Sequence, residues 1–344
     1  MKFDFCIGNP PYQDETLGDN KGYAPPVYNK FMDAACDVAD KVELIHPARF
    51  LFNAGSTPKA WNGKMLNDPH FKVLQYEEDC TKVFSNTDIK GGVAITYHDN
   101  GKDFGAIGTF TPNEILNHVL NKVLSYEGFD SFSQIVITRT AYRMTNKMHE
   151  DNPEAISKLS DGHAYDMSTN IFERLPQIFY DIKPEDEYEY IRILGRENNG
   201  RVYKWVRREY VNTPKNLDKY KIFMPKANGI GTLGEVLSSP IICEPLIGAT
   251  ETFISIGFFE VREEAESALK YIKTKFVRTL LSILKTTQDI TPEKWKYVPL
   301  QDFTSKSDID WTKPISMIDQ QLYKKYGLEQ EEIDFIEKNV KEMV

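Results

Sequence analysis

The stretch FDFCIGNPPY, residues 3–12, places a short apolar run directly before an asparagine and two prolines. An apolar run of this length is typical of a buried strand in a parallel sheet. Pro10 and Pro11 lack a backbone N–H and have a fixed φ, so they end the strand and stiffen the loop that follows. Ligands of open α/β sheets bind outside the carboxyl ends of the strands. Residues 9–12 are therefore a candidate site.

Residues 1–108 alternate between predicted strands and predicted helices. Further strands are expected at 41–47, 71–77 and 91–98, and helices at 25–39 and near 57–67. Strand–helix–strand units repeated at this spacing predict a doubly wound α/β sheet. We therefore predict a first α/β domain over residues 1–108.

The remainder of the chain has a different pattern. A helix is expected at 112–126 and a strand at 134–144, and residues 187–211 alternate around Asn199-Gly200, a strong hairpin signal. Apolar residues at helical spacing over 263–285 predict a long helix, and a polar helix ends the chain. We predict a mixed α+β domain over 109–262 and a C-terminal helical region over 263–344 that completes it.

Composition narrows the class of protein. The 344 residues are 41% hydrophobic and 27% charged, as in soluble globular proteins of two or three domains. The 4 cysteines form no C-x-x-C pair, which favours a reducing cytoplasm and argues against disulfides or structural zinc. The sequence contains neither a signal peptide nor an apolar run near the ~18 residues that span a bilayer. We expect a cytoplasmic protein with no membrane partner.

The chemistry of the 9–12 loop suits an amino group attached to an aromatic ring. Such a nitrogen is a poor nucleophile, and in a duplex its base must first be flipped out. Asn9 offers a side-chain carbonyl and Pro10 a backbone carbonyl to accept its two hydrogens, while Pro11 keeps the loop rigid. Tyr12 offers a stacking face. The alternative is a plain turn, in which Asn and Pro are common; we favour the functional loop because of its place after the strand.

The segment KFDFCIGNPPYQ resembles motif IV of S-adenosylmethionine-dependent adenine N6-specific DNA methyltransferases. The segments YAPPVYNKFMDAACD and KVELIHPARFL resemble the helix and strand after that motif. KVFSNTDIKGGVAITYH, residues 82–98, resembles the segment that adds a second aromatic ring to the base pocket. The resemblance implies that Asn9, Pro10, Pro11 and Tyr12 are catalytic and that Tyr12 and Phe84 stack on the two faces of adenine. An ordinary core role for Phe84 stays open.

The C-terminal part extends this resemblance. Residues 270–303 and 318–339 are similar to the end of bifunctional type II restriction–modification methylases. In that family a glycine-rich loop and an acidic residue ahead of N-P-P-Y hold S-adenosylmethionine, whereas here N-P-P-Y begins at residue 9. The resemblance thus implies a partial Rossmann-like sheet lacking its cofactor-binding half, followed by a target-recognition domain and helices. We expect a partner chain or segment to supply that half, and a nuclease.

Positive charge is concentrated in two segments despite a net charge of −9. Residues 192–226 and 134–149 are rich in Lys and Arg, which neutralise phosphates, so we expect double-stranded DNA as the partner. Trp205 is equally explained by inward packing, and we favour the basic residues over it. The predicted DNA contacts are Arg139, Arg143, Lys147, Arg201, Lys204, Arg207, Arg208 and Lys226.

Two weaker patterns occur. The run Gly229-Ile230-Gly231-Thr232-Leu233-Gly234 fits G-x-G-x-x-G, but a loop of the recognition domain explains it better than a cofactor site. D-x-K, a pattern of metal-dependent nucleases, occurs at 19–21, 88–90 and 181–183 without an obvious partner acid. We predict no metal site.

Three classes of function remain open from the sequence. The first is site-specific DNA adenine N6-methylation within a restriction–modification system. The second is a non-catalytic DNA-binding specificity module that needs a partner chain for cofactor binding. The third is a methyltransferase that acts on RNA or on a protein glutamine. The long region after residue 108 favours a dedicated DNA-reading domain and hence the first class.

Overall fold

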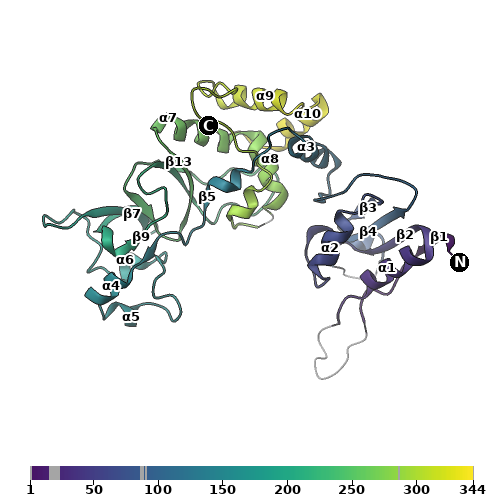
Figure 1. Cartoon of the computed structure of the whole chain (residues 1–344), viewed down its shortest axis with the longest axis horizontal. Coiled ribbons are helices and arrows are strands. Elements are labelled where there is room, and N and C mark those ends of the chain that lie inside the picture. Colours follow the sequence, from purple (N-terminus) through teal and green to yellow (C-terminus); the bar gives the residue numbers. More distant parts are fainter. Residues whose placement is uncertain (1, 15–23, 86–88, 90, 286, 344) are drawn as a thin grey trace. The chain divides into compact units, whose positions relative to one another are not determined.

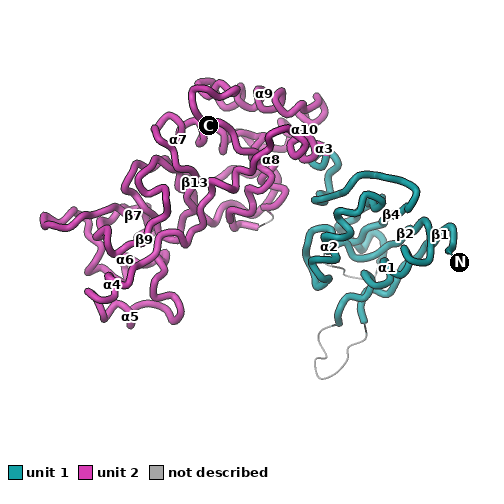
Figure 2. Tube along the Cα trace, in the orientation of Figure 1, with its two compact units in different colours: residues 1–117 teal, residues 118–344 magenta. Residues whose placement is uncertain are grey.

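The computed structural model describes residues 2–14, 24–85, 89, 91–285 and 287–343. The chain divides into two compact units, residues 1–117 and 118–344, shown in two colours in Figure 2. The α3 helix (Glu114–Leu124) crosses the division. The predicted boundary at 108 lies near this division, while the boundary at 262 stays a prediction.

Unit 1 is built on one four-stranded sheet (Figure 1). Its strands are β1 (Phe3–Gly8), β2 (Ala39–Pro47), β3 (Phe71–Glu77) and β4 (Val93–Asp99), in the order β1-β2-β4-β3. β1 and β2 are parallel, and β4 is antiparallel to both β2 and β3. β1, β2 and β3 therefore run in the same direction, with β4 inserted in the opposite one. The doubly wound prediction missed this, because strand direction is decided by pairing and not by local pattern.

Helices α1 (Tyr28–Val38) and α2 (Lys59–Leu66) complete the core of unit 1. α1 buries Tyr28, Met32 and Ala35, which recur at helical spacing. Fully buried Phe50 lies between Trp61 and Phe71, with ring centroids 5.1 and 6.2 Å away. This aromatic packing joins the α2 side of the unit to the sheet.

Among the described residues, unit 2 contains three sheets, of four, three and two strands. The first has the order β11-β10-β13-β5, the second β12-β7-β8, and the third pairs β6 with β9. Their strands are β5 (Val136–Ile137), β6 (Arg143–Met144), β7 (Tyr190–Glu197), β8 (Gly200–Arg207), β9 (Val211–Asn212), β10 (Tyr220–Pro225), β11 (Ile241–Cys243), β12 (Ile247–Ala249) and β13 (Phe253–Phe259). The chain as a whole is a mixed α/β structure with several sheets.

The helices of unit 2 fall into two groups. Short helices α4 (Asn146–Asp151), α5 (Ala155–Lys158) and α6 (Ile171–Arg174) accompany the sheets. The C-terminal group is α7 (Arg262–Lys273), α8 (Lys275–Leu284), α9 (Ile315–Lys325) and α10 (Gln330–Asn339). Short 3-10 turns lie at Arg49–Phe52, Cys80–Lys82, Phe132–Ile135, Arg208–Tyr210 and Pro292–Trp295.

Three sequence predictions in unit 2 need correction. The strand at 134–144 is two short strands, β5 and β6, separated by a turn. The helix at 263–285 is broken at buried Thr274, whose hydroxyl accepts from the Val277 N–H and so caps α8. The hairpin turn is centred on Asn198-Asn199, with φ of 49° and 62°, so two asparagines adopt the left-handed conformation in place of Gly200.

The described residues place two limits on the chain. Among them, no helix combines the length and apolar character needed to cross a membrane. They also contain no group of three or more His, Cys, Asp or Glu side chains arranged to hold a metal ion.

Candidate active site and nucleic-acid interface

Residues 9–12 lie at the carboxyl end of β1, at the edge of the sheet where β2 and β3 also end. The Tyr12 carbonyl accepts from the Val27 N–H at 3.2 Å, and the Asp14 N–H donates to the Pro25 carbonyl at 2.9 Å. These two bonds tie the loop to the chain entering α1. Asn9 is exposed and Tyr12 is half-buried, so the loop presents an amide to solvent beside an anchored ring.

Tyr12 and Phe84 lie together although they are far apart in sequence. Their ring centroids are 6.5 Å apart with planes inclined at 68°. Phe84 follows the 3-10 turn after β3, and its N–H donates to the Cys80 carbonyl at 2.8 Å. A base stacked between two rings needs about 6.8 Å between parallel rings, twice the ~3.4 Å base step. The spacing is close to this, but one ring must rotate before a base fits between them.

The phenol of Tyr12 is buried without a hydrogen-bond partner among the described residues. Burial raises its pKa, and the nearby Asn9 amide acts in the opposite direction without reaching hydrogen-bond geometry. The phenol is thus neutral at physiological pH. The tyrosine ring, and not its ionised oxygen, is what this site offers a ligand.

Two glycines and an arginine at the same edge were not singled out from the sequence. Gly91 and Gly92 have φ of 88° and 74°. A Cβ on Gly92 would lie 2.4 Å from the Glu77 carbonyl oxygen, and one on Gly91 would lie 2.9 Å from Cγ of Arg49. The Gly-Gly pair therefore lets the start of β4 approach the end of β3 and the Arg49 side chain. The adjacent glycines before an apolar run were the available signal.

Most cations predicted to contact DNA are paired with acids. Six of the eight have a carboxylate within 4.0 Å, while Arg201 and Lys226 have none among the described residues. The pairs are Arg139–Glu251 (2.9 Å), Arg143–Asp166 (3.0 Å), Lys147–Asp151 (2.8 Å), Lys204–Asp181 (2.6 Å), Arg207–Glu209 (3.9 Å) and Arg208–Asp218 (3.5 Å). An acid this close cancels much of the attraction between a cation and a phosphate.

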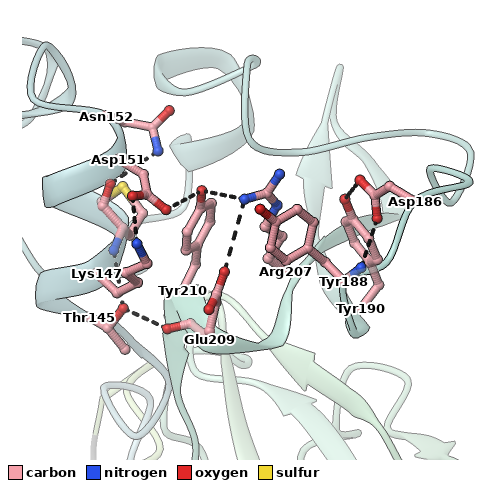
Figure 3. A network of polar contacts seen from close by, with 11 residues as sticks. Thr145, Lys147, Asp151, Asn152, Asp186, Tyr188, Tyr190, Arg207, Glu209 and Tyr210 are labelled. Carbon is pink, nitrogen blue, oxygen red and sulfur yellow. Dashed lines mark hydrogen bonds and ion pairs between the residues drawn. The ribbon is translucent and has the colours of Figure 1, made fainter.

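Arg207 lies within an internal network (Figure 3). Its guanidinium is 3.4 Å from the centroid of the Tyr188 ring and donates to the Tyr210 hydroxyl at 3.2 Å. Tyr210 in turn donates to Asp151 at 3.0 Å, and Lys147 donates to the same carboxylate at 2.8 Å. The network connects β8 to α4, so Arg207 and Lys147 contribute to the packing of unit 2.

The glycine pattern at 229–234 does not form an open cradle. The Glu235 carboxylate accepts from the N–H groups of Ile230 at 2.8 Å and Gly231 at 3.2 Å, and it also pairs with Lys285. A Cβ on Gly234 would lie 2.5 Å from Cα of Val340, so this glycine serves close packing. Because two N–H groups of the loop are paired within the chain and Gly234 serves close packing, these contacts favour a structural loop over a cofactor site.

The D-x-K patterns give no metal site among the described residues. Asp181 is paired with Lys204, and the patterns at 19–21 and 88–90 include residues outside the described part of the chain.

Comparison with known proteins bears mainly on unit 1. Residues 1–84 match the Eco57I restriction-modification methylase family. An uncharacterized adenine-specific methylase of Mycoplasma pneumoniae is 30% identical over 102 residues, which are 29% of this chain and 24% of that protein. The chain thus aligns with about a quarter of the length of this relative.

Two solved structures align with more of the chain, but at low sequence identity and low structural similarity. The type IIG restriction endonuclease BpuSI aligns with 94% of this chain and 49% of its own length, at 10% identity and a TM-score of 0.32. The type IIL restriction-modification enzyme MmeI, solved in complex with DNA, aligns with 98% of this chain and 56% of its own length, at 10% identity and a TM-score of 0.35. Such scores are too low to assign a shared fold. The matches to residues 1–84 and to the Mycoplasma methylase confirm that this chain resembles adenine methyltransferases of restriction–modification type.

Proposed function

We propose that this chain takes part in site-specific DNA adenine N6-methylation, with residues 9–12 as its catalytic loop and unit 2 as its DNA-reading part. The observation that carries the proposal is the pairing of Tyr12 with Phe84, 6.5 Å apart beside the exposed Asn9, at the carboxyl edge of the sheet. The family match over residues 1–84 includes all three residues. This edge is where α/β sheets bind their ligands.

The proposed chemistry uses positioning and electrostatics. The Asn9 side-chain carbonyl and the Pro10 backbone carbonyl accept the two N6 hydrogens of a flipped adenine, which returns the lone pair to the nitrogen. Pro10 and Pro11 hold these acceptors in place without a competing backbone donor. Tyr12 and Phe84 stack on the two faces of the base once one ring has turned. S-adenosylmethionine supplies the methyl group as an electrophile, so no covalent protein nucleophile is required.

We further propose that unit 1 is part of a Rossmann-like methyltransferase sheet whose cofactor-binding strands add to β1. β1 is an edge strand, and its side chains Phe3, Phe5 and Ile7 are 62%, 46% and 70% exposed. Strands of parallel sheets are normally covered on both faces. An exposed apolar edge of this kind favours pairing with further strands, and those strands would hold the cofactor.

The test compares Asn9→Ala, Tyr12→Ala and Tyr12→Phe in the chain supplemented with a cofactor-binding segment. Asn9→Ala removes an acceptor that matters most as N6 gains positive charge, so we expect single-turnover methylation to fall by ~10²–10³ with little change in DNA affinity. Tyr12→Ala should also weaken holding of the flipped base, by ~1–3 kcal/mol. Tyr12→Phe keeps the ring and loses only an unpaired hydroxyl, so it serves as the matched control.

The measurement is methylation of a duplex, with 2-aminopurine at the target position to report base flipping. Methylation by Asn9→Ala at the parental rate would mean that residues 9–12 are only a turn.

A non-catalytic DNA-binding module is the second candidate, because the glycine pattern at 229–234 has two N–H groups already paired with Glu235 and so favours a structural loop over a cofactor site. Calorimetric titration of S-adenosylmethionine into the chain, alone and with the cofactor-binding segment, separates the two. If S-adenosylmethionine releases heat of binding only when the segment is present, the result supports the split methyltransferase. If neither titration gives heat of binding, the result supports the non-catalytic DNA-binding module.

A further inference from the structure

The β7–β8 hairpin of unit 2 segregates its charges between its two faces. Lys204 lies on one face, where Asp181 and Glu197 are 2.6 and 3.3 Å from its amino group. The opposite face carries Arg192, Arg196 and Arg201, which have no carboxylate within 4.0 Å among the described residues. Arg207 is on the same face but lies 3.9 Å from the Glu209 carboxylate. Arg192, Arg196 and Arg201 thus keep their full charge, unlike most cations of unit 2 predicted to bind DNA.

Cross-strand pairing brings two of these positive charges close together. Arg196 and Arg201 are register partners, directly opposite each other on the two strands. Like charges in this position destabilise a sheet unless a counter-charge is present. The Arg196 guanidinium donates to the Asn199 carbonyl, and that of Arg201 to the Ser239 carbonyl. Neutral carbonyl groups orient these arginines without cancelling their charge. An anion bound to both would therefore relieve the repulsion between the two guanidinium groups.

Aromatic rings lie beside two further cations, Arg192 and Lys183. The Arg192 guanidinium lies 5.4 Å from the centroid of the Tyr203 ring and 5.6 Å from that of Trp205. The Lys183 amino group also lies against Trp205, 5.9 Å from the centroid of its ring. Because cations lie against these rings, the rings are poorly placed to stack on unpaired bases. The arrangement favours phosphate contact over the stacking that single strands use.

We propose that this arginine face, defined as Lys183, Arg192, Arg196, Arg201, Tyr203 and Trp205, binds the phosphate backbone of duplex DNA. The proposal rests on the proposed function in taking DNA as the substrate, and it assigns the contact to residues other than the acid-paired cations. Beyond Leu194, the last β7 residue paired with β12, the hairpin continues as a two-stranded ribbon that carries Arg196 and Arg201. The major groove of DNA, ~12 Å wide, admits a ribbon of this kind. The positive charge of this face, with no carboxylate of the described residues within 4.0 Å of Arg192, Arg196 or Arg201, favours a polyanion as its ligand.

The first experiment measures binding of the full chain to a labelled duplex by anisotropy over a range of salt concentrations. Arg192→Gln and Arg201→Gln should each weaken binding and flatten the plot of log affinity against log salt by roughly one unit. Arg192→Lys keeps the charge and should keep the slope. The matched controls are Arg139→Gln and Arg208→Gln, whose parent side chains are exposed but paired with Glu251 and Asp218; their slopes should stay near the parental one.

The second experiment uses tryptophan fluorescence. Of the 4 tryptophans, Trp61, Trp295 and Trp311 are buried, with 9%, 0% and 7% exposure, whereas Trp205 is half-buried on the arginine face. Acrylamide should quench mainly Trp205, duplex DNA should protect it, and Trp205→Phe should abolish the protected signal. Thermal unfolding of every variant checks that the fold is retained.

Unchanged slopes for the Arg192 and Arg201 variants, or equal losses for the Arg139 and Arg208 controls, would overturn the assignment. Tighter binding of single-stranded DNA or duplex RNA through the same residues would overturn the choice of duplex DNA. Asn9→Ala should retain the parental salt slope while losing methylation, so failure of the arginine face and failure of the proposed methylation give different results.

Discussion

At the scale of single residues, His46 shows how burial sets a pH limit on unit 1. It is fully buried, with Nε2 2.7 Å from the Thr96 hydroxyl and its ring stacked on Tyr28 at 5.8 Å and 7°. Burial lowers the pKa of His46 to about 4, against 6.5 for the free side chain, although a hydrogen bond to the Pro47 carbonyl opposes this. The folded state therefore favours the neutral imidazole.

The sign of the pH effect follows from this shift. A histidine whose pKa is depressed on folding contributes its full stability above pH ~6.5, and this stability is lost as the pH falls from there towards ~4. The loss should be on the order of 3 kcal/mol for unit 1. Thermal unfolding followed between pH 7 and pH 4 measures it, and His46→Gln should flatten the dependence. An equally steep dependence in His46→Gln would assign the effect to other groups.

At the scale of elements, β1 shows a conflict between its sequence and its surroundings. Its apolar run forms a strand as expected, yet Ile7 is 70% exposed at the edge of the sheet. Ile7→Glu should therefore leave the thermal unfolding of the isolated chain within about 0.5 kcal/mol of the parent. The same change should block methylation reconstituted with the cofactor-binding segment, because a charge would be buried in the new contact.

The matched control is Met317→Glu in α9, which is 52% exposed but lies on an element with no role in the proposed sheet. Its reconstituted activity should equal that of the parent chain. Full reconstitution by Ile7→Glu would show that the cofactor-binding segment does not pack on this edge.

At the scale of the whole molecule, the two units have separate hydrophobic cores. One cluster of buried residues lies between 28 and 94 and another between 142 and 253. Phe50 belongs to the first and Phe223 to the second, and both are fully buried. Truncation of a buried phenylalanine to alanine costs ~3–5 kcal/mol through lost contacts and the cavity it leaves.

We therefore expect Phe50→Ala and Phe223→Ala to lower different transitions in the calorimetric unfolding of the full chain. Phe50→Ala should shift the unfolding of unit 1 alone, and Phe223→Ala that of unit 2 alone. The DNA salt slope should survive Phe50→Ala at temperatures where unit 2 is folded. A single transition moved equally by both substitutions would mean that the units unfold as one cooperative body.

The sequence by itself determined the features that depend only on residues close together along the chain. The strand at 3–8, the loop at 9–12, the helix predicted at 25–39 and found at 28–38, and the existence of the β7–β8 hairpin all follow from local periodicity and turn chemistry. The resemblance of residues 9–12 to a catalytic motif was visible for the same reason, because its chemistry lies in four consecutive residues. The break at Thr274 is also local, because its hydroxyl accepts from the Val277 N–H and caps α8.

Only the tertiary structure decided which side chains meet. Phe84 reaches Tyr12, and Arg139 pairs with Glu251, 112 residues further along the chain. Such contacts depend on how strands pair and loops close, which no local pattern encodes. The structure therefore distinguished Arg192 and Arg201, which have no nearby acid in the described part of the chain, from the equally basic Arg139 and Arg208. The physical reason is that the charge available to a ligand depends on neighbours in space and not in sequence.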